Sequence, residues 1–447
     1  MQSPNPASPP PQTEAPTGGA PGFGLIFLVL LVIAAGNTAL QSVLPALGRQ
    51  LHLRDISVAL FFSLSALVWT FSAPYWARRS DREGRKHILL TGLIGFTVAT
   101  ALGAVIMLVG LRGMIPTAAF IAALALARAV FGLFGSATMP SAQAYVAART
   151  SRVNRTDALA KLNSAFGLGT IIGPALAPFF VLPLLGLSGP LLVFAAVGLI
   201  VLILVRARLP SDHGMIDDLA ATGAPASQPS VGGAPTGATA VAAAEGRGRL
   251  NWRDPRVKPF IIFGALSANA QAAASQTLGF LVIDRLHMAP EPAQRFIGIA
   301  LMAGAVAALL VQWGLIQTFH LKPSALLRWG ALASALGLAG VALAQDYHAI
   351  VVAFALANAG FGCTRPGFAA GCSLAVRPWE QGAVAGAVTA ANGGAFILAP
   401  AIGIGLYEID PHLPFVMSAL VLAALFVYSA LNRRLAVSGV DVSSARA

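Results

Sequence analysis

The chain has 447 residues, of which 56% are hydrophobic and only 10% are charged, and its mean hydropathy is +0.74. Soluble domains carry about a quarter charged residues, so this composition excludes a soluble globular protein and indicates one that crosses a membrane many times. The net charge of +12 does not indicate a nucleic-acid-binding protein, because the charges fall in short loops between apolar runs.

The first 22 residues are rich in Pro and Ser and have no basic segment ahead of an apolar run. They predict a disordered tail and not a cleaved signal peptide. Twelve apolar stretches follow, each of a length that lets a helix cross a hydrocarbon core of about 30 Å. They cover residues 23–46, 56–77, 88–110, 115–146, 162–184, 189–206, 258–283, 293–317, 327–344, 348–375, 382–407 and 413–432.

Residues 207–257, between the sixth and seventh stretches, are low in aromatic residues and rich in Ala, Gly and Pro over much of their length. They predict a largely disordered linker. The expected fold is therefore an all-α integral membrane protein with twelve transmembrane helices in two six-helix bundles. The bundles cover residues 23–206 and 258–432, with tails at 1–22 and 433–447.

The basic residues orient these helices. If the N-terminus lies inside, most Lys and Arg fall in cytoplasmic loops, and the opposite side receives only Arg49, Arg54, Arg112, Arg285 and Arg295. Loops rich in Lys and Arg stay in the cytoplasm. We therefore expect both termini to be cytoplasmic and the chain to lie in the plasma membrane, the inner membrane of a bacterial-type cell.

The two halves of the chain also resemble each other. ALARAVFG (125–132) matches ALANAGFG (355–362) at six of eight positions, and two further pairs follow in the same order: QSVLPALGRQLHL with QTLGFLVIDRLHM, and IIGPALA with ILAPAIG. One such match in an Ala- and Gly-rich chain has little weight, but three in register indicate a duplicated six-helix unit. Many secondary transporters are built from such repeats around a central site.

The segment ARRSDREGRK (77–86) resembles the signature loop between helices two and three of the major facilitator superfamily. Ala77 stands where the family has Gly, and the matching residues are Asp81, Arg82, Gly84, Arg85 and Lys86. The resemblance implies a carrier that works by alternating access. It also implies that Asp81 rests at the start of helix eleven, at Gln381–Gly382, where the helix dipole favours a carboxylate. The charges would otherwise serve only to fix topology.

Two further motifs narrow this resemblance. GLGTIIGPALAP (167–178) resembles the helix-five motif of drug–proton antiporters at Gly169, Gly173 and Pro174, with Ala177 and Pro178 in place of its last two glycines. Spaced small residues also let any helix approach closely. ARAVFGLFGSA (127–137) resembles the helix-four motif with its buried Arg, and residues 362–386 resemble helices ten and eleven of tetracycline-type efflux pumps. These matches favour export over uptake.

Polar residues within the predicted helices are the candidates for a substrate cavity. An arginine inside a bilayer is costly unless it is paired or hydrated. Arg128 and Arg365 fall within predicted helices, so each is either a functional residue or a clamp on a neighbouring helix. The candidate lining residues are Asn37, Gln41, Arg128, Asn269, Gln276 and Arg365. Two cations with no deep Asp or Glu favour a substrate that is neutral or negatively charged.

Proton coupling would need a titratable group, and Asp284, near the end of its helix, is the best carboxylate left for it. A salt bridge with Arg285 or a solvated helix end is the alternative. The seven histidines lie in loops or at helix ends and do not cluster, which argues against an enzyme. Cys363 and Cys372 lie about 13 Å apart along one helix, too far for a disulfide. We expect no metal and no cofactor.

The sequence thus predicts a monomeric secondary transporter that exports a small, partly hydrophobic, neutral or anionic organic compound, with protons as the coupling ion. Its partners are the substrate and the lipid bilayer, and no nucleic acid is expected. An uptake carrier for an organic anion on the same fold remains an alternative. A receptor or scaffold that does not transport is the alternative from a different class.

Overall fold

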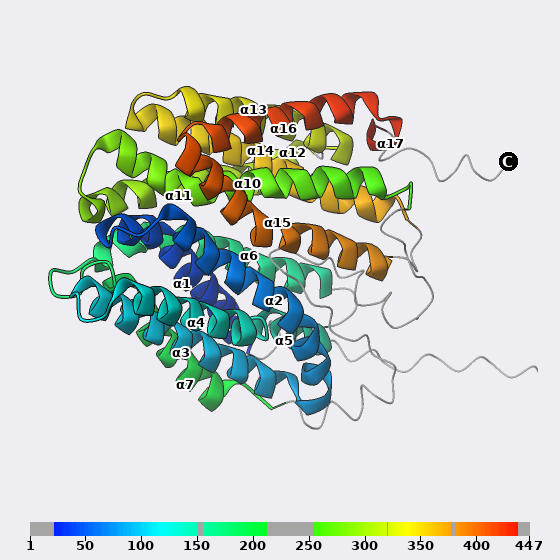
Figure 1. The fold of residues 1–447 in the computed structure, drawn as a ribbon. Helices are drawn as coiled ribbons and strands as arrows, with labels where there is room; N and C mark the ends of the chain where they lie inside the picture. The colour runs from blue at the N-terminus through cyan, green and yellow to red at the C-terminus, as the bar shows by residue number, and fades with distance from the viewer. Residues whose placement is uncertain (1–21, 151–154, 212–253, 320, 377–380, 437–447) are drawn as a thin grey trace, which may run out of the picture.

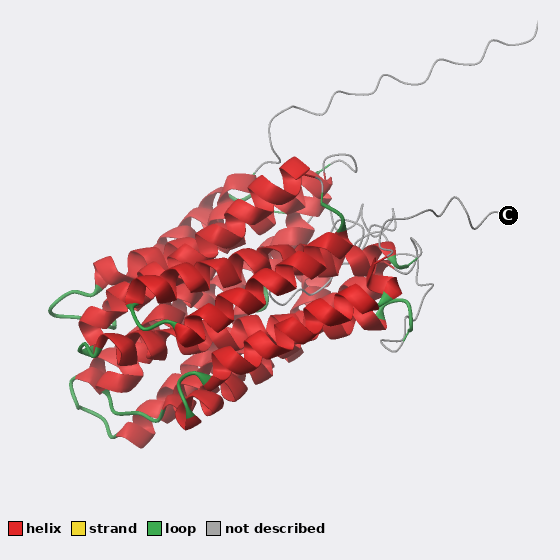
Figure 2. Ribbon diagram, turned by 90° about the horizontal axis from the view of Figure 1, so that it is seen from above, coloured by secondary structure: helices red, strands yellow, loops and turns green. Residues whose placement is uncertain are grey.

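The computed structural model describes residues 22–150, 155–211, 254–319, 321–376 and 381–436, and helices make up nearly all of this part of the chain (Figure 1 and Figure 2). In chain order the helices are α1 (Phe23–Gln50), α2 (Asp55–Glu83), α3 (Arg85–Leu111), α4 (Thr117–Gly135), α5 (Thr138–Ala148), α6 (Arg155–Leu176), α7 (Gly189–Arg208), α10 (Lys258–Leu286), α11 (Pro290–Leu310), α12 (Ile316–Phe319), α13 (Pro323–Leu343), α14 (Tyr347–Leu374), α15 (Gln381–Ile409), α16 (Leu413–Leu431) and α17 (Arg433–Ala436). A 3-10 helix (Ala177–Phe180) extends α6, and a π-helical turn (Val311–Leu315) joins α11 to α12.

The helices have the length and the apolar character of membrane spans. Within the described residues, eleven spans, formed by single helices or by joined segments, satisfy both criteria. The twelfth long helix, α10, has 29 residues and carries Asn269, Gln271 and Gln276; such amides lower the hydropathy of a helix. The prediction of an all-α, multi-spanning membrane protein is confirmed.

The predicted helix 115–146 is in fact two helices, α4 and α5, which meet at Ser136. Two features explain the break. Pro140 has no backbone N–H to donate to the carbonyl of Ser136 four residues earlier. The Ser136 hydroxyl donates back to the Leu133 carbonyl over 2.8 Å, a contact that bends helices. Its Oγ also lies 2.9 Å from Ser72 Oγ on α2.

The helices form two bundles that lie side by side (Figure 1). Helices α1–α7 make the N-terminal bundle, coloured blue to green, and α10–α17 make the C-terminal bundle, coloured green to red. Helices α1, α2 and α6 contact α10, α11 and α15 across the seam between them. We call the end that holds Leu209 and Asp254 the linker end, and the end that holds residues 51–54 and 287–289 the far end.

Close helix packing across and within the bundles depends on glycine. A Cβ added at Gly169 of α6 would lie 2.4 Å from the Leu31 carbonyl oxygen of α1, and one at Gly173 would lie 2.2 Å from the Ala35 oxygen. Gly298 of α11 approaches α6 in the same way, with its added Cβ 2.6 Å from the Pro174 oxygen. The small residues of the predicted antiporter motif therefore lie where α1 packs on α6.

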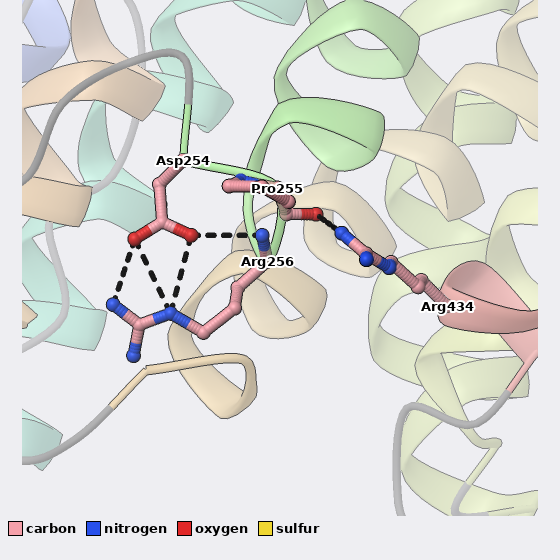
Figure 3. Close-up of polar contacts among 4 residues, drawn as sticks. All are labelled: Asp254, Pro255, Arg256 and Arg434. Carbon is pink, nitrogen blue, oxygen red and sulfur yellow. Dashed lines mark hydrogen bonds and ion pairs between the residues drawn. The ribbon is translucent and has the colours of Figure 1, made fainter.

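Each bundle holds its own end of the chain segment that joins the two bundles. In the N-terminal bundle, Tyr145 Oη donates to the Pro210 carbonyl over 2.9 Å and Arg149 Nη2 to the Ser211 carbonyl over 3.0 Å. In the C-terminal bundle, Arg434 donates to the Pro255 carbonyl, and Arg256 pairs with Asp254 at 2.7 Å (Figure 3). Most of the predicted linker 207–257 and of the tails 1–22 and 433–447 lies outside the described residues.

Candidate functional site

Arg128 on α4 is buried, with 6% of its surface exposed. Its Nη2 donates to Asn37 Oδ1 on α1 over 3.2 Å and to Ser65 Oγ on α2 over 3.1 Å. The guanidinium carbon lies 4.6 Å from the ring centre of Phe131 and 5.4 Å from that of Phe62. This arginine therefore ties three helices of the N-terminal bundle together and gains stabilisation from two aromatic faces.

A small cavity of about 20 Å³ lies beside this arginine. It is lined by α1, α3, α4 and α7, with Asn37, Thr100 and Arg128 as its polar residues. A volume of this size holds about one water molecule. The cavity belongs to the interior of the N-terminal bundle and does not extend to the C-terminal bundle.

The four amide candidates lie on two helices that contact each other across the seam. Asn37 and Gln41 are half-buried on α1, Asn269 is half-buried on α10, and Gln276 on α10 is 6% exposed. Of these four amides, Asn37 accepts a described hydrogen bond from Arg128. The structure thus brings Asn37 to Arg128, and it places the four amides on two helices, α1 and α10, that contact each other across the seam.

Arg365 on α14 differs from Arg128. Its side chain is exposed, although the neighbouring Thr364 is 1% exposed and Phe368 is 2% exposed. This combination is expected of a side chain that faces an internal space open to solvent. Thr364 also accepts a hydrogen bond from Ser267 of α10 over 3.2 Å, which fixes α14 against α10 at this level.

At the far end, the two bundles are joined by charged residues. Arg49 Nη2 at the end of α1 lies 2.9 Å from Asp284 Oδ2 on α10 and 3.1 Å from Asp55 Oδ2 at the start of α2. Tyr407 Oη on α15 donates to the same Asp284 oxygen over 2.6 Å. The partner of Asp284 is thus Arg49 and not the neighbouring Arg285, which contacts Gln345 and His412 instead.

Further contacts at this end join α2 to α15. The backbone N–H of Ile56 donates to Glu408 Oε1 over 3.0 Å, and Arg54 lies 3.7 Å from the same carboxylate. Nearer the middle of the seam, Gln294 of α11 donates to Ser42 of α1 over 3.3 Å. Between described residues, the hydrogen bonds and ion pairs that join the two bundles all come from these contacts toward the far end.

The signature segment makes the joint between α2 and α3 at the linker end. Gly84 has a φ of 101° and separates the two helices, a conformation that few residues other than glycine adopt. Arg82 is exposed, whereas Arg85 is 9% exposed. Lys86 donates to the Leu209 carbonyl, and also to that of Arg206 over 3.2 Å, at the end of α7. The backbone at Asp81 and at Gln381–Gly382 is helical, and the side-chain contact expected between them lies outside what the structure describes.

Two bundles of long apolar helices, joined by contacts toward one end, have the architecture of a membrane carrier with two halves. The chain belongs to the Major Facilitator Superfamily, whose family model matches residues 26–344. Members of this family are transporters and not enzymes, so the chain is a multi-pass membrane transporter.

Curated relatives match over part of the chain. The multidrug efflux pump LfrA of Mycolicibacterium smegmatis is 29% identical over 166 residues, which are 37% of this chain and 31% of that protein. The class E tetracycline resistance protein of Escherichia coli is 31% identical over 159 residues, 35% of this chain and 36% of that protein. These matches span about a third of the relatives' length.

Solved structures match over nearly the whole chain. The human organic anion transporter MFSD10 superposes with a TM-score of 0.61 at 18% identity, covering 91% of this chain and 98% of that one. A POT family transporter in complex with 5-aminolevulinic acid gives a TM-score of 0.66 at 13% identity, covering 94% of this chain and 96% of that one. At these identities the likeness concerns the fold alone.

Proposed function

We propose that this transporter exports a small, partly hydrophobic organic compound that is neutral or carries a negative charge, by alternating access between its two bundles. The observation that carries the substrate class is Arg365, a cation that is accessible to solvent in a helix otherwise buried around it. An arginine in a membrane span that faces an internal space is a binding group for a carboxylate or another anion.

The amides of α1 and α10 complete the proposed site. Asn37 and Gln41 on one side of the seam and Asn269 and Gln276 on the other supply hydrogen-bond donors and acceptors without charge. Arg128 has a positioning role in this proposal, because its Nη2 holds Asn37 and Ser65. Its hydrogen bonds to two helices of its own bundle favour a structural clamp over direct contact with substrate.

Export is supported by the relatives, which are named as a multidrug efflux pump and a tetracycline resistance protein. We further propose that the linker end is cytoplasmic, because most of the Lys and Arg residues lie in loops on that side. With the far end closed by Arg49 and Asp284, the described arrangement is then the one closed to the outside. The plasma membrane, a monomeric state and proton coupling belong to the same proposal, with coupling through the far-end cluster that contains Asp284.

Substrate counterflow in proteoliposomes tests the proposal. The panel comprises an anionic dye, tetracycline and the cation ethidium, each measured with and without a pH gradient across the vesicle membrane. We expect exchange of the anionic or the neutral compound and none of ethidium. Arg365→Ala should reduce exchange of the anionic compound by tenfold or more, the loss of about 1.4 kcal/mol of binding free energy. Arg112→Ala, at an exposed far-end position, is the matched control and should exchange normally.

Normal exchange of the anion by the Arg365→Ala protein would disprove the role of Arg365. Two other functions are outcomes of the same assay. Accumulation driven inward by the gradient would indicate an uptake carrier for an organic anion, and the absence of exchange for a broad panel would favour a receptor or scaffold that does not transport.

A further inference from the structure

The far-end cluster holds two carboxylates on one cation. Arg49 Nη2 contacts Asp284 Oδ2 at 2.9 Å, across the two bundles, and Asp55 Oδ2 at 3.1 Å, within the N-terminal bundle. The guanidinium carbon also lies 5.6 Å from the ring centre of Phe280. One guanidinium nitrogen cannot neutralise two carboxylates fully, so the cluster with both aspartates ionised carries an excess negative charge.

The two aspartates are not equivalent. Asp284 is 37% exposed at its side chain, and its Oδ2 accepts hydrogen bonds from both Arg49 and Tyr407. The Asp55 side chain is 8% exposed, and its Oδ1 is buried with no hydrogen-bond donor. Burial without donors disfavours the ionised form of a carboxyl group. A proton that enters the cluster therefore binds Asp55 and not Asp284.

The charges around the cluster reinforce this difference. Glu408 on α15 accepts from the Ile56 N–H and pairs with Arg54, which is 80% exposed at its side chain. Arg285 on α10 is engaged by Gln345 and by His412, the residue that precedes α16. Among the described residues, Arg49 is thus the cation that contacts Asp55, and Glu408 adds a further negative charge nearby.

We propose that Asp55 is a proton-binding site that controls closure of the far end. When Asp55 is ionised, it competes with Asp284 for Arg49 and holds the guanidinium within the N-terminal bundle. When Asp55 is protonated, Arg49 pairs with Asp284 alone, and the two bundles are joined more strongly. Proton binding at Asp55 therefore favours the closed far end, whatever the substrate and the direction of transport.

The two aspartates consequently have opposite effects on the same equilibrium. Asp55→Asn imitates the protonated residue and should keep the far end closed at every pH. Asp284→Asn removes the negative charge on α10 that pairs with Arg49 and should open the far end at every pH. A purely structural cluster, in which both carboxylates only stabilise Arg49, would respond to the two substitutions in the same direction.

Distances between spin labels at the far end test this proposal without any substrate. Labels on Met114→Cys, in the loop between α3 and α4, and on His348→Cys, at the start of α14, report the two bundles from exposed positions. The buried Cys363 and Cys372 are replaced by Ala. The full chain in lipid nanodiscs is measured by pulsed electron–electron double resonance from pH 5 to pH 8.

We expect the open population to rise with pH, by at most about tenfold per pH unit for a single proton. Asp55→Asn should abolish this dependence and give the closed distance throughout. Arg54→Gln, the matched control, should keep the dependence. Tyr407→Phe removes a donor that shares Asp284 Oδ2 with Arg49 but lies in the same bundle as Asp284. It should therefore lower the open population while keeping the dependence on pH, so the cluster remains testable if Asp284→Asn does not fold.

Two results would overturn the proposal. One is a wild-type distance distribution that does not change between pH 5 and pH 8. The other is an Asp55→Asn protein that opens the far end, because Asp55 would then act only as a structural partner of Arg49. Size-exclusion chromatography of each variant confirms that the change is conformational and not a loss of fold.

Discussion

Gly173 gives the sharpest test of the packing between α1 and α6. A Cβ at this position would meet the Ala35 oxygen at 2.2 Å and Thr38 Oγ1 at 2.3 Å, whereas ordinary contacts of a Cβ begin at 3.4 Å. The Ala35 oxygen belongs to the helix backbone, so Gly173→Ala forces α6 and α1 apart by roughly 1 Å. Overpacking of this kind costs about 1–3 kcal/mol, and for a chain of this length the melting temperature should fall by about 1–3 °C.

The assay is thermal unfolding of the purified protein in detergent, followed by the loss of the monodisperse peak. Gly167→Ala is the matched control on the same helix, because its added Cβ would meet only the Leu309 side chain at 3.8 Å. Its melting temperature should stay within about 0.5 °C of the wild type, since changes that meet no close neighbour cost under about 0.5 kcal/mol. Equal melting temperatures for the two variants would show that α1 and α6 do not pack as closely as described.

Three further outcomes follow from the site and the linker. Arg128→Met leaves Asn37 Oδ1 and Ser65 Oγ without their donor, which costs about 1–3 kcal/mol and should lower the melting temperature, whereas the exposed Arg82→Met should not. Gly84→Ala imposes a side chain at a φ of 101°, so transport should fall in the counterflow assay; Gly24→Ala, in open space, is its control. The hydrogen bonds from Arg256 lower the pKa of Asp254 below its ordinary 3.8, so the Asp254–Arg256 contact is fully formed above pH 3.8 and is lost as the pH falls through the lowered pKa. The protection of the amides of residues 256–258 against exchange, relative to their intrinsic rates at the same pH, should fall there, and Asp254→Asn should show the lower protection already at pH 7.

The fold was predictable because it depends on the lengths of the apolar stretches, which can be read directly from the sequence. Twelve apolar stretches and a duplicated pattern are sufficient to predict two helical bundles. The break between α4 and α5 was not foreseen, since Pro140 follows Ser136 inside one continuous apolar run. The break is explained in part by the contact between Ser136 and Ser72 on α2, and no local sequence pattern predicts that contact.

The far-end cluster was only partly predictable. The sequence indicates Asp284 as a carboxylate of interest, but it does not indicate the partner, because Arg49 lies 235 residues away. A signal was present in the repeat: when QSVLPALGRQLHL is aligned with QTLGFLVIDRLHM, Arg49 and Asp284 occupy the same position. Residues at equivalent positions of two halves related by an approximate twofold axis can meet on that axis. Asp55 and Tyr407 lie outside the matched segments, so their part in the cluster required the structure.

The anchoring of the linker has a consequence for how the protein can be made. Pro210 and Ser211 are bound by the N-terminal bundle, and Asp254 and Pro255 by the C-terminal bundle, so neither anchor crosses the seam. Each bundle therefore carries all the described groups that hold its own end of the linker. A gene divided between the codons for residues 211 and 254 should yield two polypeptides that associate in the membrane through the α2–α15 and α6–α11 surfaces. The product would be a split transporter whose halves can be labelled separately.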